Sequence, residues 1–187
     1  MEKFSLNLLF HIVGIGSASG LFYTPGNVFL VSDNGGFLYE YSIDDKKLAK
    51  TRLLESDVLE NIPKKIKPDF EALAQKDGKL YIFGSGSTPA RCVLKIVDLE
   101  SKHIETADLS PLYKKMQTVS NIDAENFNLE GAVWDGNDWL LLQRGNGSSN
   151  SNGVFRIHAS LENLSEITFT PVTLPKIKHV PTSFTDA

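Results

Sequence analysis

The sequence has few of the residues that build disulfide-rich or zinc-binding proteins. Cys92 is its single cysteine, and its four histidines show no metal-binding spacing. An internal disulfide and a cysteine-rich zinc site are therefore excluded, and the fold must be held together by its hydrophobic core.

The sequence also lacks a strong charge of either sign. Its 187 residues include 19 basic and 23 acidic side chains, which leaves a net charge of −4. A balance this even, without a dense run of Lys or Arg, predicts neither a nucleic-acid partner nor binding to a membrane surface. The length suits one domain of roughly 150 residues.

No early apolar run is long enough to cross a membrane. Residues 4–15 are interrupted by Ser5, Asn7 and His11 and fall short of the ~20 residues that a span needs. Their alternating pattern favours a β-strand, so we expect a cytoplasmic protein. The alternative is a signal peptide, because small residues follow at 16–19, and the protein would then be periplasmic or secreted.

The main positive feature is a pattern that recurs about every 55 residues. Each copy has a small or acidic residue, a short apolar strand, a tight turn and a second apolar strand. The copies begin at Ser19, Glu71 and Glu130, and a fourth begins near residue 184. Asp-Gly and Gly-Asn pairs in these turns favour β-hairpins, because such residues tolerate positive φ.

Two further strands follow each hairpin, and four antiparallel strands per repeat are typical of a β-propeller blade. We therefore predict an all-β chain with blades at about residues 17–56, 69–110 and 128–175, and the start of another at 182–187. Only residues 57–62 and 111–117 are expected to be helical turns. An open β-sheet domain that repeats is the alternative.

The number of repeats indicates whether the residues given could form a closed propeller. A propeller closes with at least about four blades, so three predict one incomplete domain over residues 1–187. We expect it to be the N-terminal part of a five- or six-bladed propeller.

Three sets of residues give the chain a likeness to known families: Ser19–Leu21 with Leu30–Asn34, Pro68–Ala74 with Phe83–Ser87, and Asn128–Ala132 with Arg144–Asn146. In these, the chain resembles an uncharacterised bacterial β-propeller family of unknown function. It is more distantly similar to the esterase-like-phytase and gluconolactonase-type propellers. The resemblance to the gluconolactonase-type propellers implies that Glu130 binds a divalent metal.

The starts of the innermost strands are expected to converge on one mouth of the propeller. They carry Glu71, Glu130 and Asp186, and carboxylates brought together raise one another's pKa or recruit a cation. Ca²⁺ or another divalent cation suits such oxygen ligands. We predict these three residues as metal ligands, with Glu71 and Glu130 also catalytic. The alternative is that each acid caps its own strand.

The second strands and the loops after them supply further candidates. Asp33, Arg91 and Arg144 are predicted to bind substrate, since an arginine holds a carboxylate or phosphate through two hydrogen bonds. Arg144 bridging to the acid of a neighbouring blade is the alternative. The basic loop at 63–68 is expected to be solvated.

Two functions from different classes remain open. The first is metal-assisted hydrolysis of a small ester, lactone or phosphoester. The second is non-catalytic binding of a small molecule or a protein at the mouth of the propeller. Fold alone does not choose between them, because propellers host many functions.

Overall fold

The computed structural model describes residue 5, residues 7–145 and residues 151–185. Its main body consists of three four-stranded antiparallel sheets, and in every sheet the strands follow the order of the chain. We call the sheets blade 1, blade 2 and blade 3. The prediction of an all-β chain with four-stranded antiparallel blades is confirmed.

The blades have the following strands. Blade 1 contains β1 (Ala18–Thr24), β2 (Asn27–Ser32), β3 (Phe37–Ser42) and β4 (Lys47–Arg52). Blade 2 contains β5 (Phe70–Lys76), β6 (Lys79–Gly84), β7 (Val93–Asp98) and β8 (Ile104–Asp108). Blade 3 contains β9 (Leu129–Trp134), β10 (Asp138–Gln143), β11 (Gly153–His158) and β12 (Ile167–Pro171).

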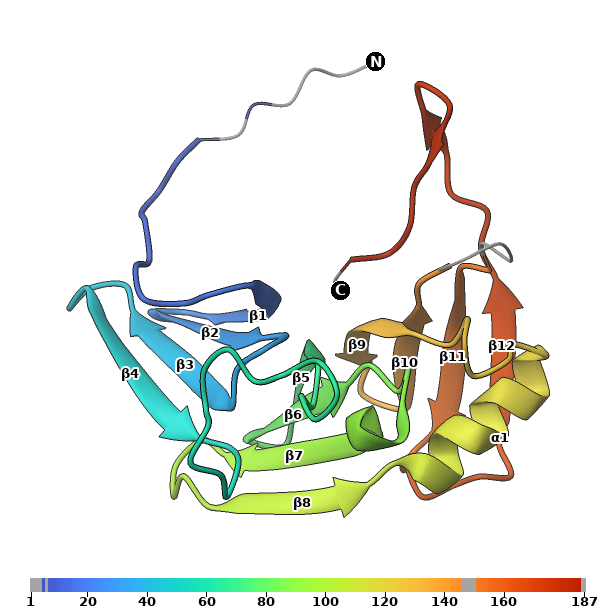
Figure 1. The fold of residues 1–187 in the computed structure, drawn as a ribbon, viewed down its shortest axis with the longest axis horizontal. Coiled ribbons are helices and arrows are strands. Elements are labelled where there is room, and N and C mark those ends of the chain that lie inside the picture. The colour runs from blue at the N-terminus through green and yellow to red at the C-terminus, as the bar shows by residue number, and fades with distance from the viewer. Residues whose placement is uncertain (1–4, 6, 146–150, 186–187) are drawn as a thin grey trace.

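The blades stand side by side in an arc (Figure 1), as in a propeller. Their first strands, β1, β5 and β9, line the inner side of the arc, and each contacts the first strand of the next blade. The fourth strands, β4, β8 and β12, lie at the periphery. Residues at the start of the first strands are therefore brought together, as the repeat predicts.

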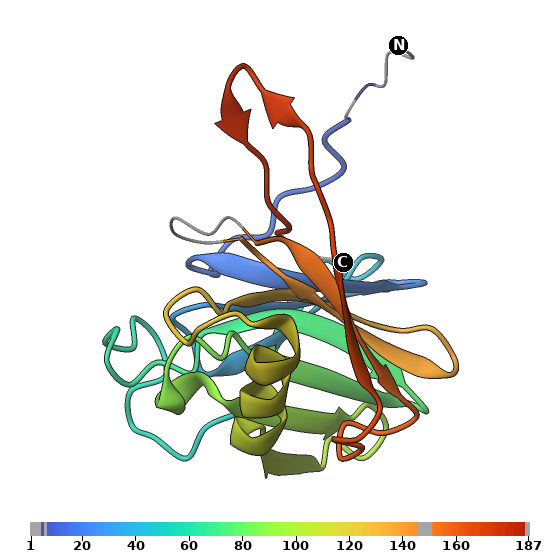
Figure 2. The same ribbon diagram turned by 90° about the vertical axis from the view of Figure 1, so that its right-hand side faces the viewer.

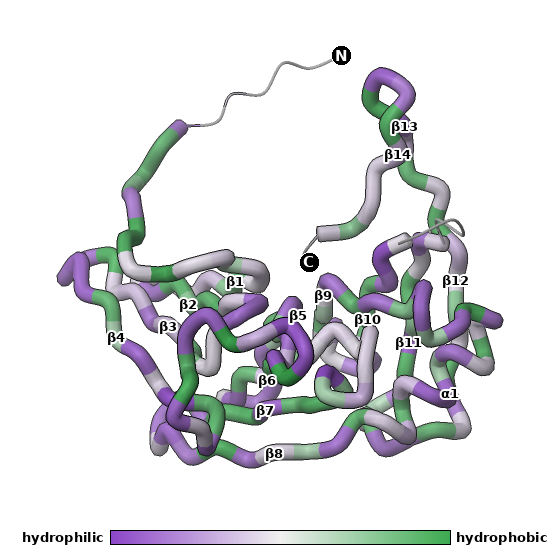
Figure 3. The backbone as a smooth tube through the Cα atoms, in the orientation of Figure 1, coloured by the Kyte–Doolittle hydropathy of each residue, from purple (hydrophilic) through white to green (hydrophobic). Residues whose placement is uncertain are grey.

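The core lies between the blades. Blades 1 and 2 share one hydrophobic cluster, in which Val31, Phe70 and Ile82 are fully buried. Blades 2 and 3 share a larger one around Trp139 and Phe155. Hydrophobic residues fall mainly on the strands, and hydrophilic ones on the connections (Figure 3). Burial of such apolar surface is the main stabilising term, at about 25 cal/mol per Å².

One helix, α1 (Ser110–Ser120), follows β8 and covers the outer side of this larger cluster. The helical turn predicted at 111–117 is thus confirmed and is longer than expected. Pro111 lies in its first turn, where a missing N–H is tolerated, and Asn121 ends it in the left-handed region with φ 56°. A 3₁₀ turn, η1, occupies Pro89–Arg91.

The helical turn predicted at 57–62 is wrong. The backbone there is bent and is bonded to blade 1 instead, because Gly36 N donates to the Leu59 carbonyl and Ile62 N donates to the Asn34 carbonyl. These two bonds, each 2.9 Å long, take the place of the bonds within a helical turn.

The strand predicted at residues 4–15 is also wrong for the described part of that segment. Residues 7–15 have no strand partner there. Of their apolar side chains, Phe10, Ile12 and Ile15 pack against blade 1, whereas the others are exposed. Phe10 stacks on Tyr41 with ring centroids 5.2 Å apart.

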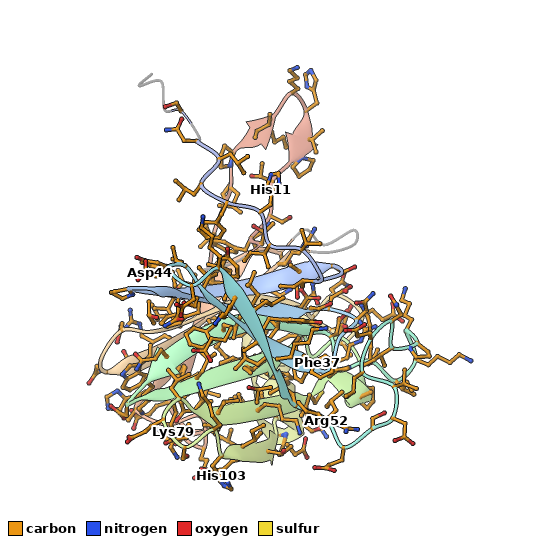
Figure 4. All side chains as sticks on the ribbon, turned by 90° about the vertical axis from the view of Figure 1, so that its left-hand side faces the viewer. His11, Phe37, Asp44, Arg52, Lys79 and His103 are labelled. Carbon is orange, nitrogen blue, oxygen red and sulfur yellow. The ribbon has the colours of Figure 1, made fainter. Side chains whose placement is uncertain are left out.

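Figure 4, which faces blade 1, shows His11 beyond the blade and Asp44 and Arg52 at opposite ends of it.

A short hairpin that the sequence did not predict follows blade 3. Its strands are β13 (Lys176–Ile177) and β14 (Val180–Pro181), and it projects on the same side of the body as the N-terminal segment (Figure 2). Among the described residues, no helix combines the length and apolar character that crossing a membrane requires.

Candidate functional site

The first strand of each blade has a bulge at the position that repeats in the sequence. In β5, Phe70 pairs with Gly84 and Ala72 with Phe83, so Glu71 has no partner of its own. In β9 the same shift omits Glu130, and in β1 it falls between Ala18 and Leu21. A bulge redirects the side chain of the extra residue. The sequence repeat therefore marks three irregularities of the backbone that give these side chains a common direction.

A second repeated feature fixes the ends of the second strands. Asp33 N donates to Ser17 O at 3.2 Å, Ser85 N to Asp69 O at 2.9 Å, and Arg144 N to Asn128 O at 2.9 Å. Ser17 and Asp69 have φ of 47° and 54°, in the left-handed region. The same bond in each blade thus places Asp33, Ser85 and Arg144 at equivalent positions.

These two sets of positions surround a pocket of about 370 Å³, which we call the axial pocket. Its walls are Ser17, Ala18, Ser19, Asp33, Glu71, Glu130, Arg144 and Thr185. Four of the six predicted site residues, Asp33, Glu71, Glu130 and Arg144, are therefore brought together. Asp186, predicted as a metal ligand, lies outside the described residues.

Lys67 joins blades 1 and 2 beneath the axial pocket. Its Nζ lies 2.8 Å from Asp33 Oδ2 and 2.6 Å from Asp69 Oδ1, and its side chain is only 13% exposed. Burial alone would lower the pKa of Lys67, but the hydrogen bonds to Asp33 and Asp69 raise it overall. The expectation that this basic loop is solvated is therefore wrong for Lys67, whose largely covered side chain is held between two carboxylates.

Arg91 supports the same cluster from blade 2 and does not line the axial pocket. Its Nη1 lies 2.8 Å from Asp69 Oδ2 and 2.7 Å from Ser87 Oγ. Ser85 Oγ also donates to Asp69 Oδ2, at 2.7 Å. Asp69 is thus surrounded by donors, and its buried charge is compensated. The predicted contact of Arg91 with substrate stays a prediction.

Glu130 is paired within its own blade. Arg144 Nη1 lies 3.1 Å from Glu130 Oε1, and Asn128 Nδ2 donates to the same oxygen at 2.5 Å. Burial raises the pKa of Glu130, and the charge of Arg144 opposes that rise. Arg144 thus pairs with an acid, as the alternative interpretation held, although not with one from a neighbouring blade.

Glu71 differs from Glu130 in having no donor. Among the described residues no hydrogen bond or ion pair reaches its carboxyl group, whose pKa is raised to about 8 by burial and then by Glu130, Asp69 and Asp33. Asp33 Oδ1 is likewise buried without a hydrogen-bond partner in the described chain. The axial pocket therefore holds two carboxyl groups with unused acceptor oxygens.

Three carboxylates come close enough together to bind a metal ion. Single oxygens of Asp33, Asp69 and Glu71 all lie within 4.8 Å of one another. Between two of them, however, lies the Lys67 ammonium, which already supplies a positive charge to Asp33 and Asp69. Of these three acids, Glu71 alone has no contact with a cation among the described residues.

Solved β-propellers are similar to this chain. The β-propeller domain of Cps50 (Swd1) from Myceliophteria thermophila is 10% identical, with a TM-score of 0.43 over 88% of this chain and 42% of that one. The RRP9 WD40 repeats are 12% identical, with a TM-score of 0.45 over 82% of this chain and 39% of that one. The chain thus spans less than half the length of these proteins.

A third similar structure is the extracellular domain of BT4673 from B. thetaiotaomicron. It is 14% identical, with a TM-score of 0.47 over 88% of this chain and 18% of that one. Likenesses at this level add nothing about activity. None of the curated proteins compared with the sequence matches it. A family model does match, over residues 14–187, and the chain therefore belongs to the family of unknown function DUF6929.

Proposed function

We propose that the chain is a binding propeller whose axial pocket holds the positively charged group of a small ligand. The observation that carries this proposal is the Glu71 carboxyl group, which lines the pocket without a donor among the described residues. Asp33 Oδ1, on the same wall, has no partner there either. A buried acceptor without a donor, such as Asp33 Oδ1, is costly, and a cation bound beside the half-buried Glu71 carboxyl would offer both groups a partner.

The charge already in the pocket favours a cation beside Glu71. Asp33 and Asp69 share the two cations Lys67 and Arg91, and Glu130 is paired with Arg144. Glu71 has no such partner, and its raised pKa keeps most of it protonated at neutral pH. A ligand cation would favour the ionised form and release a proton. A divalent ion such as Ca²⁺ would be held by Glu71 and Glu130, with Asp33 at the edge of the site.

Calorimetric titration with two cations tests this proposal. CaCl₂ represents a divalent ion, and ethylammonium chloride represents an amine. We expect at least one of them to bind with a heat that differs between buffers of different ionisation enthalpy, because Glu71 loses its proton. Glu71→Gln should abolish that buffer dependence and weaken binding at least about tenfold, which corresponds to about 1.4 kcal/mol.

The matched control is Asp44→Asn, which removes one carboxylate from an exposed turn of blade 1 outside the axial pocket. It should bind like the unmodified protein. Absence of binding by both cations would overturn the proposal, as would equal binding by the Glu71→Gln variant.

A metal-assisted hydrolase is the second candidate, and one observation favours it. Glu71 and Glu130 line the same pocket, but only Glu130 is paired with an arginine. Burial raises the pKa of both groups, and the charge of Arg144 opposes that rise at Glu130; such unequal surroundings are typical of acid–base pairs. Arg144, which is 39% exposed, would hold the substrate anion. Turnover of an ester, lactone or phosphoester that requires a divalent ion and is lost in Glu71→Gln would support this function. If no compound of the screen is turned over, the hydrolase candidate is rejected and the binding function is the one that stays.

A further inference from the structure

A second pocket lies between blades 2 and 3, and none of its lining residues belongs to the axial pocket. Its volume is about 400 Å³, within the usual range of small-molecule sites. We call it the inter-blade pocket. Residues from both blades, from the start of α1 and from the connection between β11 and β12 form its walls, among them Tyr81, Ala107, Trp139 and Leu164.

The floor of the inter-blade pocket is apolar and aromatic. Trp139 is 1% exposed, and its ring lies 4.7 Å from that of Tyr81, between ring centroids. Leu161 and Leu164 are half-buried and pack against the same core cluster. A rigid floor of this kind binds apolar groups at little conformational cost, because its rings are already fixed by packing.

The walls of the inter-blade pocket include three charged side chains, one basic and two acidic. Lys76 Nζ lies 3.7 Å from the centroid of the Trp134 ring and donates to the Ala159 carbonyl at 3.1 Å, so it is held in place by neutral groups and keeps its positive charge. Asp108 and Glu162 are exposed. Hydrogen bonds from Ser110 lower the pKa of Asp108, which is therefore ionised at neutral pH. Two carboxylates and one ammonium thus border the apolar floor, so acidic groups outnumber basic ones in the lining.

We propose that the inter-blade pocket binds a small apolar ligand that carries an ammonium group, such as an arylalkylamine. The ring would lie against Tyr81, Trp139 and Leu164, and the ammonium would face Asp108 or Glu162. Aromatic rings add to the attraction of a cation, and the two carboxylates complement its charge. This site is independent of the function proposed for the axial pocket, since the two share no residue.

Intrinsic fluorescence measures binding here directly. The chain has two tryptophans, Trp134 and Trp139, whose rings lie 5.3 Å apart beside this pocket, and neither lines the axial pocket. Three probes of similar size separate shape from charge: phenethylamine, 2-phenylethanol and 3-phenylpropionate. We expect a saturable change in tryptophan emission with phenethylamine, and binding of 3-phenylpropionate weaker by at least about tenfold.

Two variants make the test specific. Ala107 is exposed on β8 and lines the pocket, so Ala107→Phe would fill the space without disturbing the core. Ala49→Phe is the matched control, because Ala49 is exposed on β4, the equivalent outer strand of blade 1. Ala107→Phe should abolish the response, and Ala49→Phe should retain it.

Three outcomes would overturn this proposal without bearing on the axial pocket. The first is that no probe gives a saturable response, the second is equal affinity for the amine and the carboxylate, and the third is an unchanged response in Ala107→Phe. Thermal melting of both variants verifies that each is folded. Glu71→Gln should leave the fluorescence response intact, so failure at one pocket does not count against the other.

Discussion

Lys67 forms ion pairs with two carboxylates at the candidate site. It bonds both Asp33 at the end of β2 and Asp69 at the start of blade 2. Lys67→Met would leave two largely buried carboxylates without this cation, which we expect to lower the free energy of unfolding by about 3 kcal/mol. Urea denaturation measures the change. Lys65→Met, on an exposed neighbour, should have almost no effect, and an equally small effect of Lys67→Met would contradict the prediction.

Glu71 predicts a pH dependence of the opposite sign to that of a paired acid. Its pKa is about 8 in the folded protein and near the ordinary value of 4.5 in the unfolded chain. The folded state therefore binds the proton more tightly between these values, so stability is highest below pH 4.5 and falls as the pH rises toward 8. The loss is at most about 1.4 kcal/mol for each pH unit.

The variant Glu71→Gln isolates this effect. It cannot ionise, so its advantage over the unmodified protein should increase from pH 5 to pH 8. Thermal melts across that range measure the difference. A difference that stays constant with pH would show that Glu71 titrates normally.

At the scale of single residues, the sequence identified the acids but not their partners. Glu71 and Glu130 stand out because they repeat at equivalent places, and a bulge then directs both to one pocket. Lys67 has no such signal. It lies 34 residues from Asp33, and nothing in its loop distinguishes it from Lys64 and Lys65. Long-range ion pairs of this kind follow from how the blades pack.

At the scale of elements, α1 is fixed to blade 2 by one buried hydrogen bond. Tyr113 Oη donates to the Gly84 carbonyl at 2.8 Å, and Tyr113 is 1% exposed. Tyr113→Phe removes the donor and leaves the shape of the ring, so we expect a loss of about 1–2 kcal/mol in unfolding free energy. Chemical denaturation measures it. Tyr23→Phe is the control, since Tyr23 is 59% exposed, and equal effects of the two variants would rule out this role of the bond.

Elements with a strong local signal were predicted well. Hairpins such as β5–β6 have a turn residue with positive φ, here Asp77 and Gly78, between apolar strands. Residues 7–15 were predicted wrongly because alternation fits a strand, while a strand also needs a partner. Half of their apolar side chains pack against blade 1 instead, and the other half are exposed. The hairpin β13–β14 has mostly exposed residues and little pattern to predict it.

At the scale of the whole molecule, the two pockets arise in different ways. Equivalent bulges and equivalent backbone bonds bring the first strands of three blades to one axial pocket. The inter-blade pocket instead depends on what differs between blades, namely α1 and the connection after β11. A repeat in the sequence therefore predicts the first pocket and not the second.

The same architecture predicts how the molecule opens. The second strands are paired on both sides, and residues such as Leu80, Ile82 and Leu141 are fully buried. The fourth strands are paired on one side only, and most of β8 is exposed. Local opening needs less free energy where fewer apolar contacts are broken. In hydrogen-exchange mass spectrometry, we therefore expect peptides from β4, β8 and β12 to exchange at least about tenfold faster than those from β6 and β10.

The exchange rates of the outer and second strands also distinguish two ways in which the blades could be coupled. If each blade opens from its outer edge, protection should increase from the fourth strand to the second within every blade. If the interfaces between blades hold the chain as one unit, all strands of a sheet should instead exchange together, at the rate of global unfolding. Equal protection of β6 and β8 would support that second case and contradict the prediction. In the first case blade 1 should also open before blades 2 and 3, because the larger hydrophobic cluster spans those two blades.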